Sequence, residues 1–206
     1  MNTLIVSSIA LFAGAALSSA ADKEPRFAPG PATGYATRQT IDKVTIAAVP
    51  YTSEEQVRSA FGKLDPNKYG ILPLLVVIQN DGTQTVTLDN LKLEYITPSR
   101  THIDPTPARD VPYVSGNIKQ PRIENSPLPT GSPRVSRKKN PLAGGQIDVR
   151  AFSARMLPPG EVASGFFYFQ TLNKVGAKLY LTGIREASSG KELFYFEIPL
   201  SYDGSR

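Results

Sequence analysis

Few residues of this sequence could perform acid–base or nucleophilic catalysis. His102 is the sole histidine and cysteine is absent, so thiol nucleophiles, thiolate metal sites, disulfides and an N-terminal lipidated cysteine are excluded. A serine–histidine–aspartate set would need His102 together with Asp104 or Asp110, but no Gly-x-Ser-x-Gly elbow accompanies them. We therefore interpret His102 as an exposed loop histidine, and we predict no catalytic residue and no enzymatic activity.

Two weaker motifs are also better explained without chemistry. Ser188 and Lys191 fit a Ser-x-x-Lys pattern, which in enzymes opens a helix but here falls in a predicted turn. Asp104 and Asp110 are separated by two prolines and an arginine, and they lack the closely spaced oxygen ligands of a calcium loop. Two Gly-Lys pairs occur in the sequence, but neither has the other residues of a phosphate-binding glycine loop. The sequence thus predicts no metal site and no cofactor.

Aromatic residues on two predicted strands form one candidate interaction surface. Residues 166–169 read Phe-Phe-Tyr-Phe, so a strand at this place is apolar on both faces. The same is true of residues 194–196, which read Phe-Tyr-Phe. One face must fill a core, and the other must be covered by another part of the chain or by a partner. We single out Phe166, Tyr168 and Tyr195 as candidate docking residues, with cover from within the chain as the alternative.

A basic cluster is the strongest polar feature, and it consists of Arg134, Arg137, Lys138 and Lys139. The sharper interpretation is an arm that grips an acidic glycan, lipid headgroups or an acidic partner. A solvated loop kept soluble by its charge is the alternative. Nucleic acid is not an expected partner, because the start of the chain predicts export.

The first twenty residues indicate where the protein goes. Residues 1–20 carry no charged side chain, residues 4–17 form an apolar run interrupted by two serines, and small residues follow. This pattern is typical of a secretory signal peptide, and we expect cleavage near Ala20 or Ala21 and a periplasmic or secreted product. The run is short of the about 20 apolar residues that span a membrane. Retention as an anchor is therefore the alternative, and no transmembrane segment is expected in the mature chain.

The remaining chain has the length and composition of one globular domain. The sequence has 206 residues, of which 40% are hydrophobic and 20% charged. Residues 21–40 predict an irregular N-terminal arm, because prolines and glycines interrupt them. Ser53, Gln56 and Gly62 supply the capping box and the stop signal of one short helix.

Short apolar segments with turn signals between them predict strands. Residues 71–79 are apolar on both faces and predict a buried central strand, and Asn80-Asp81-Gly82 predicts a hairpin within a three-stranded meander over 70–97. Further strands are predicted over 162–171, 177–184 and 193–200, the last with Phe194, Phe196, Ile198 and Leu200 on one face. The pattern is typical of an all-β fold, an immunoglobulin-like antiparallel β-sandwich of about seven strands, formed by residues 41–97 and 146–206.

Residues 98–145 differ in composition from the segments on either side. They hold nine of the 18 prolines, and their eight basic and three acidic residues give a net charge of +5, equal to that of the whole protein. We interpret this segment as a long basic insertion that is disordered when free, because it cannot bury enough apolar surface to offset its ordering entropy.

Two stretches resemble a known group of exported modules. Residues 74–80 read Leu-Leu-Val-Val-Ile-Gln-Asn and precede Asp-Gly and the strand over 86–95, and Leu157-Pro-Pro-Gly-Glu leads into the strand that holds Gly165 to Phe169. These stretches resemble the bacterial exported immunoglobulin-like modules of the FxLYD-type and telokin-like group. The resemblance implies an immunoglobulin-like fold, an exported location and a non-catalytic role, and it carries over no functional residue.

These observations predict a non-catalytic binding or scaffold module of the bacterial cell envelope. We expect it to dock a protein partner through aromatic strands or a sheet edge, with help from the basic insertion. The alternative is a binder of acidic glycan or lipid headgroups through the basic cluster, and the third is a hydrolase that uses His102. The sequence leaves the oligomeric state open.

Overall fold

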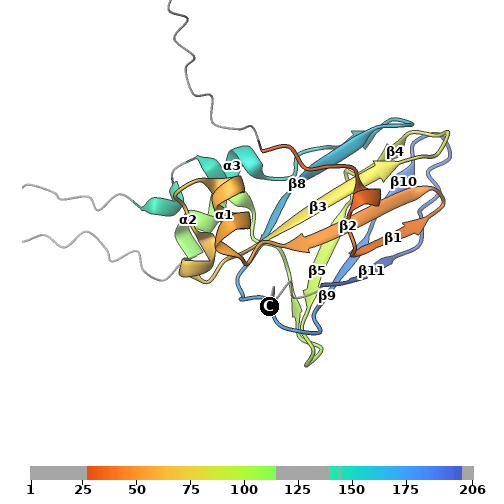
Figure 1. Cartoon of the computed structure of the whole chain (residues 1–206). Coiled ribbons are helices and arrows are strands. Elements are labelled where there is room, and N and C mark those ends of the chain that lie inside the picture. Colours follow the sequence, from red (N-terminus) through yellow and green to blue (C-terminus); the bar gives the residue numbers. More distant parts are fainter. Residues whose placement is uncertain (1–26, 115–139, 144, 201–206) are drawn as a thin grey trace, which may run out of the picture.

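Two main antiparallel sheets and one small sheet form the body of the protein (Figure 1). The computed structural model describes residues 27–114, 140–143 and 145–200. The first sheet has the order β1-β2-β3-β8, with strands Arg38–Ile41, Val44–Pro50, Leu72–Asn80 and Val162–Phe169. The second has the order β11-β9-β5-β6, with strands Phe196–Pro199, Lys178–Thr182, Lys92–Ile96 and His102–Ile103. The third joins β10, β4 and β7, at Arg185–Glu186, Val86–Thr87 and Met156–Leu157.

The strand order is that of an immunoglobulin-like sandwich, which confirms the predicted fold class. The run β2-β3-β8 takes the places of strands A, B and E, and β11-β9-β5-β6 takes those of G, F, C and C′. These are seven strands, and every neighbouring pair among them is antiparallel. β1 and the three strands of the small sheet are additions to these seven strands.

The main core lies between the two large sheets. Alternate residues of β5, β9 and β11 point inward and are buried, because side chains along a strand alternate between its faces. They meet Val44, Leu74, Val76 and Ile78 from the first sheet. Tyr95 is fully buried there, and its hydroxyl donates to Asn173 Oδ1 (3.2 Å) and accepts from Lys174 N (2.8 Å). The core thereby fixes the loop between β8 and β9.

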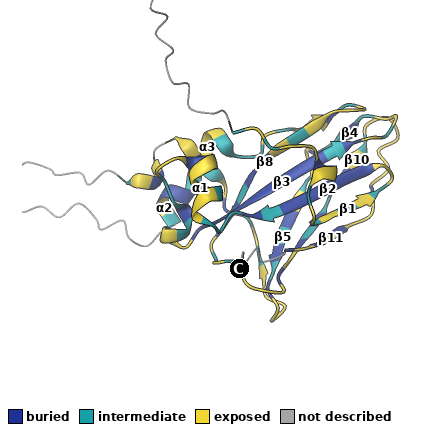
Figure 2. Ribbon diagram, in the orientation of Figure 1, coloured by how far each residue is buried: buried dark blue, intermediate teal, exposed yellow. Residues whose placement is uncertain are grey.

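A layer of short helices covers the other face of the first sheet. The layer contains α1 (Glu54–Phe61), α2 (Val111–Val114) and α3 (Gln146–Arg150) at one end of the molecule (Figure 2). Phe61, Val111 and Ile147 from these helices pack with Phe166 and Tyr168 of β8 in a second core. Both faces of β3 are therefore buried, as its apolar sequence predicts. The remaining helical turns are 3₁₀, at Ala32–Gly34, Pro66–Tyr69, Ala108–Asp110 and Pro141–Ala143.

The predicted short helix is confirmed as α1, together with its capping box. Ser53 Oγ accepts from Gln56 N, and Gln56 Oε1 accepts from Ser53 N, both at 3.2 Å. Gly62 follows the helix with a φ of 65°, a left-handed value that glycine adopts without a steric penalty. The apolar residues Val57, Ala60 and Phe61 are the ones that α1 buries against the sheet.

The predicted meander over 70–97 is wrong. β3, β4 and β5 lie in three different sheets, and Asn80-Asp81-Gly82 begins a crossing between sheets instead of a hairpin. The reason lies in the Asn80 side chain, which is 1% exposed. Its amide donates to Gln84 O (2.8 Å) and to Leu157 O (2.9 Å), while its oxygen accepts from Gly82 N (3.0 Å).

The predicted segment boundaries also need correction. Residues 98–114 belong to the folded body, since they contain β6 and α2, and Pro141–Ala143 forms a 3₁₀ turn. Val111 and Leu142 anchor the two ends of the insertion because both are buried in the second core. In the N-terminal arm, residues 38–40 are part of β1. The disorder predicted for residues 115–139 and the signal peptide predicted for residues 1–20 lie outside the described residues.

Candidate functional site

The structure removes two of the three aromatic docking candidates from the surface. Phe166 and Tyr168 are each 1% exposed and lie in the second core. Phe61 packs on Phe166 at a centroid distance of 4.8 Å, and the Tyr168 hydroxyl donates to Ile147 O at 2.8 Å. The second aromatic face of β8 is thus covered from within the chain, so neither ring is available to a partner in this fold.

The third candidate, Tyr195, does lie at the surface and is 53% exposed. Its ring stacks on Tyr180 of β9, with centroids 5.4 Å apart and planes 30° apart. Phe194 beside it is 74% exposed, which corrects the prediction that Phe194 shares the buried face of the last strand. β11 begins only at Phe196, so the inward alternation starts after these two residues. We call Tyr180, Phe194 and Tyr195 the aromatic face.

An ion pair and a histidine–carboxylate contact flank the aromatic face on the outer side of the second sheet. Glu94 of β5 and Glu197 of β11 lie directly opposite Tyr180 in the two adjoining strands. Lys178 Nζ donates to Glu197 Oε1 at 2.5 Å, and His102 Nδ1 lies 2.5 Å from Glu94 Oε2. The stacked rings of Tyr180 and Tyr195 thus lie beside two carboxylates that each have a cationic or imidazole partner.

His102 lies at the surface and is in hydrogen-bond contact with Glu94. Its side chain is 58% exposed, and it extends from the two-residue strand β6 to Glu94. It lines neither the hollow beside α1 nor the one beside the 3₁₀ turn Pro66–Tyr69. The Ser-x-x-Lys motif lies in a turn as predicted, and its Lys191 ammonium faces Asp42 at 3.5 Å. Among the described residues, His, Asp and Glu do not gather in groups of three that could hold a metal ion.

The sheet edges offer little backbone for strand addition. Glu197 N donates to Gln39 Oε1 at 2.7 Å, which links the edge strands β11 and β1. On the other side, Thr106 N donates to Tyr168 O (2.7 Å) and Phe152 N donates to Phe166 O (3.1 Å), so the second half of β8 is engaged. Among the described residues, the start of β8 and the outer edge of the two-residue strand β6 have no such backbone bond. Edge docking therefore has less structural support than docking on the aromatic face.

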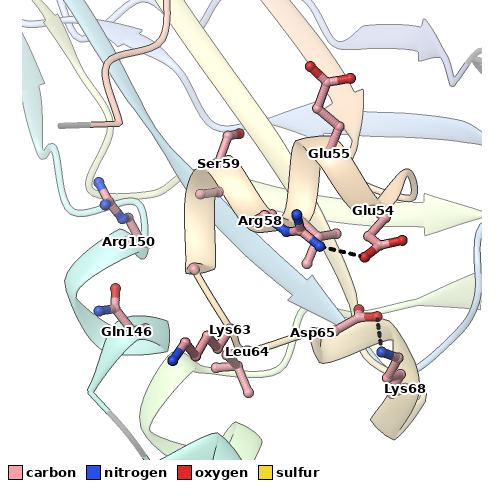
Figure 3. Close-up of a pocket in the computed structure, with 13 residues that line it drawn as sticks. Glu54, Glu55, Arg58, Ser59, Lys63, Leu64, Asp65, Lys68, Gln146 and Arg150 are labelled. Atoms are coloured by element: carbon pink, nitrogen blue, oxygen red, sulfur yellow. Dashed lines mark hydrogen bonds and ion pairs between the residues drawn. The ribbon is translucent and has the colours of Figure 1, made fainter. Parts of the chain in front are cut away.

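A groove lies at the helical end of the molecule, between α1 and α3 (Figure 3). Its volume is about 1180 Å³, and α1 and the residues that follow it form most of its wall. Two ion pairs lie on one side: Arg58 with Glu54 at 2.7 Å, and Lys68 with Asp65 at 3.6 Å. Figure 3 shows Lys63 near Gln146 on the other side, toward α3, and Arg150 farther along α3 with its guanidinium directed away from Lys63. We call this space the α1–α3 groove.

Sequence reasoning missed the groove and part of the aromatic face. Tyr180 appears in sequence as an ordinary outward residue of an alternating strand. It meets the Tyr195 ring because it pairs with Glu197, two residues after Tyr195. Lys63 and Arg150 are far apart in sequence, and both line the groove because α3 packs beside α1. The basic cluster, Arg134, Arg137, Lys138 and Lys139, lies outside the described residues.

Comparisons with known proteins identify no family. No family model matches the sequence, and no curated protein matches it. Among solved structures, YcdA of Bacillus subtilis, a candidate lipoprotein, has a TM-score of 0.37 at 12% identity, over 79% of this chain and 38% of that one. The apo PCuAC domain of PmoF2 has a TM-score of 0.31 at 10% identity, over 82% and 97%. A protein of unknown function from Listeria monocytogenes has a TM-score of 0.32 at 12% identity, over 80% of each chain.

These likenesses are too weak to transfer a ligand or an activity. The chain spans well under half of YcdA, and its TM-scores with all three structures are low. The function must therefore be argued from this chain's own surfaces.

Proposed function

We propose that this protein is a non-catalytic, exported binding module that docks a protein partner through the aromatic face. The observation that supports the proposal is the exposure of Phe194 and Tyr195 beside well-packed strands, with Tyr195 stacked on Tyr180. Tyrosine and phenylalanine are enriched in protein interfaces, and tyrosines with few rotatable bonds frequently carry much of the binding energy. Their position over a filled core means that little ordering is needed on binding.

The exported location rests on the sequence of residues 1–20, with release near Ala20 or Ala21 into the periplasm or the medium. Among the described residues, no helix is both long enough and apolar enough to cross a membrane. The absence of catalysis rests on the surface position of His102 and on the lack of cysteine. A hydrolase centred on His102 gains no support from the groove, because His102 does not line it.

The test compares capture of envelope proteins by three forms of the purified protein. They are the wild type, a Phe194→Ser/Tyr195→Ser variant, and a Tyr113→Ser control that removes an aromatic ring 76% exposed on α2. We expect one partner to be captured by the wild type and the control and reduced at least ~10-fold for the double variant, as for an interface hot spot. Circular dichroism confirms that each variant is folded.

Equal capture by all three forms, or none by folded wild type, would contradict docking at the aromatic face. The alternative of an acidic glycan or lipid headgroup bound by the basic cluster would then come first. It predicts salt-sensitive binding that is lost when Arg134, Arg137, Lys138 and Lys139 are replaced by serine.

A further inference from the structure

Two loops lie side by side at one end of the sandwich, beyond the paired ends of β5 and β9. The loop over 97–101 follows β5 and the loop over 170–177 precedes β9, and the last residue of β5 pairs with the first residue of β9. A Cβ added at Gly176 would lie 3.6 Å from the ring of Pro98, so the two loops are neighbours. Figure 1 shows both at the lower end of the view. We call these two loops the loop tip.

The second loop exposes two apolar side chains, although its backbone is anchored to the core. Leu172 is 58% exposed and Val175 is 73% exposed. Between them, Lys174 N donates to the hydroxyl of the buried Tyr95 at 2.8 Å, and that hydroxyl donates to Asn173 Oδ1 at 3.2 Å. The anchor fixes the backbone on which both apolar side chains are exposed. Apolar side chains exposed in this way commonly mark a contact with a protein or a membrane.

The first loop is held by a tight turn. Arg100 N donates to Thr97 O, and Thr101 N donates to Thr97 Oγ1, both at 2.9 Å. Thr97 itself is 4% exposed. Because both loops are fixed before binding, docking through them costs little ordering entropy.

The loop tip also carries positive charge. Arg100 is exposed in the first loop and Lys174 in the second, and residues 97–101 and 170–177 contain neither Asp nor Glu. The ion pairs formed among the described residues include neither of these two cations. The charge and the apolar side chains of the loop tip together complement a surface that is anionic outside and apolar beneath.

An anionic lipid bilayer has those two properties. Apolar side chains of peripheral proteins enter the boundary between headgroups and acyl chains, while neighbouring lysines and arginines stay at the lipid phosphates. The loop tip also projects from the end of the sandwich, so it can reach a flat surface without rearrangement of the fold (Figure 1).

We propose that the loop tip docks this protein on an anionic lipid bilayer, with Leu172 and Val175 in the bilayer interface and the two cations at the lipid phosphates. Tyr195 of the aromatic face precedes β11, and β11 begins at the end of the sheet remote from the loop tip. Docking on a bilayer therefore leaves the aromatic face open to a protein partner. The inference goes beyond the proposed function and does not depend on it.

The test is cosedimentation of the purified mature protein with lipid vesicles. The predicted signal peptide is left out, because its apolar run would bind lipid by itself. One vesicle type is phosphatidylcholine alone, and the other is three parts phosphatidylcholine to one part phosphatidylglycerol. We expect the protein to bind the anionic vesicles at least ~10-fold more tightly than the neutral ones, and salt to weaken this binding because it screens exposed charges.

Two variants test the apolar contribution. Leu172→Ser/Val175→Ser should lower the affinity for anionic vesicles at least ~10-fold, because it removes the side chains that enter the interface. Val149→Ser is the matched control, since Val149 is 79% exposed on α3, at the helical end of the molecule. It should bind as the wild type does.

Two further variants test the charge. Arg100→Gln/Lys174→Gln should lower the affinity for anionic vesicles at least ~10-fold and leave binding to neutral vesicles unchanged. Lys174 contacts Tyr95 through its backbone amide, so the substitution keeps the anchor of the loop. Lys92→Gln is the control, because Lys92 is an exposed lysine at the other end of β5. The basic cluster is intact in all four variants, so a loss belongs to the loop tip.

A single tryptophan reports whether the loop tip enters the bilayer. The sequence contains no tryptophan, so Val175→Trp places the only one at the loop tip and Val149→Trp places the only one at the control position. On anionic vesicles the emission of Val175→Trp should shift to shorter wavelength and be quenched by lipids brominated in their acyl chains. The emission of Val149→Trp should do neither.

Three results would overturn the proposal. The first is a folded wild-type protein that does not bind anionic vesicles, which would leave a protein as the partner of the loop tip. The second is an affinity that both loop-tip double variants leave unchanged, which would assign vesicle binding to the basic cluster. The third is a Val175→Trp emission that ignores the vesicles. Circular dichroism establishes that each variant is folded.

Discussion

Tyr51 illustrates how burial of a single residue couples stability to pH. Its ring packs edge-on against Phe166 at the margin of the second core, with centroids 4.9 Å apart. Burial, with a smaller contribution from the nearby Tyr35, raises the pKa of Tyr51 from 10.0 to about 12. Burial also raises the pKa of Tyr168, in the same core. The phenols of this core are thus held in their neutral form.

The shift of Tyr51 predicts a loss of stability at alkaline pH. Below pH 10 the phenol is neutral in both the folded and the unfolded chain, so the full contribution of Tyr51 to the stability of the fold is present. As pH rises from 10 toward 12, the unfolded chain ionises first and is favoured, so the melting temperature should fall across this window. Tyr51→Phe should flatten that part of the curve, whereas Tyr113→Phe, at an exposed position, should follow the wild type. Scanning calorimetry against pH measures both, and a Tyr51→Phe curve that coincides with the wild type would refute the assignment.

At the scale of elements, local sequence predicted the strands better than the sheets they join. The two-sided apolar pattern of residues 71–79 is enough to indicate a strand covered on both faces, and β3 has that burial. The residues that cover β8 could not be named from the sequence, because they come from α1, which lies far away in sequence, and from α3, which was not predicted as a helix. The hairpin at residues 80–82 failed because a turn signal is local, whereas the contact between Asn80 and Leu157 spans 77 residues.

The Asn80 amide should therefore be a major stabilising contact of the end of β3. Asn80→Ala would leave the carbonyls of Gln84 and Leu157 and the Gly82 amide without this partner, in a site where Asn80 itself is buried. We expect the free energy of unfolding to drop by about 2–4 kcal/mol, the sum of several unmade buried hydrogen bonds. Chemical denaturation measures the change. The control is Asn90→Ala, an exposed amide, which should cost little. Equal losses in the two variants would contradict a stabilising role of the Asn80 hydrogen bonds.

At the scale of the whole molecule, the layers determine which surfaces remain for binding. The first sheet is covered on both faces, by the second sheet and by the helices, so aromatic content alone does not mark an interface here. What stays open is the outer side of the second sheet and the α1–α3 groove at the helical end. The sequence indicated one residue of the first surface, Tyr195, and none of the second, because each surface is assembled from separate elements.

The ends of the basic insertion suggest that the fold does not require the segment between them. Asn140 Nδ2 donates to Pro112 O at 2.6 Å, so the chain leaves α2 and returns beside it. Replacing residues 115–139 with a Gly/Ser linker of about six residues should leave the unfolding free energy unchanged or raise it by about 1 kcal/mol, because a shorter loop costs less entropy to close. Urea denaturation of the wild type and the variant measures this. A loss above about 2 kcal/mol would mean that these residues pack on the folded body, since that is the scale of a lost apolar side-chain contact. If stability holds, the variant separates the basic cluster from the fold, and any binding that it loses belongs to Arg134, Arg137, Lys138, Lys139 and their neighbours.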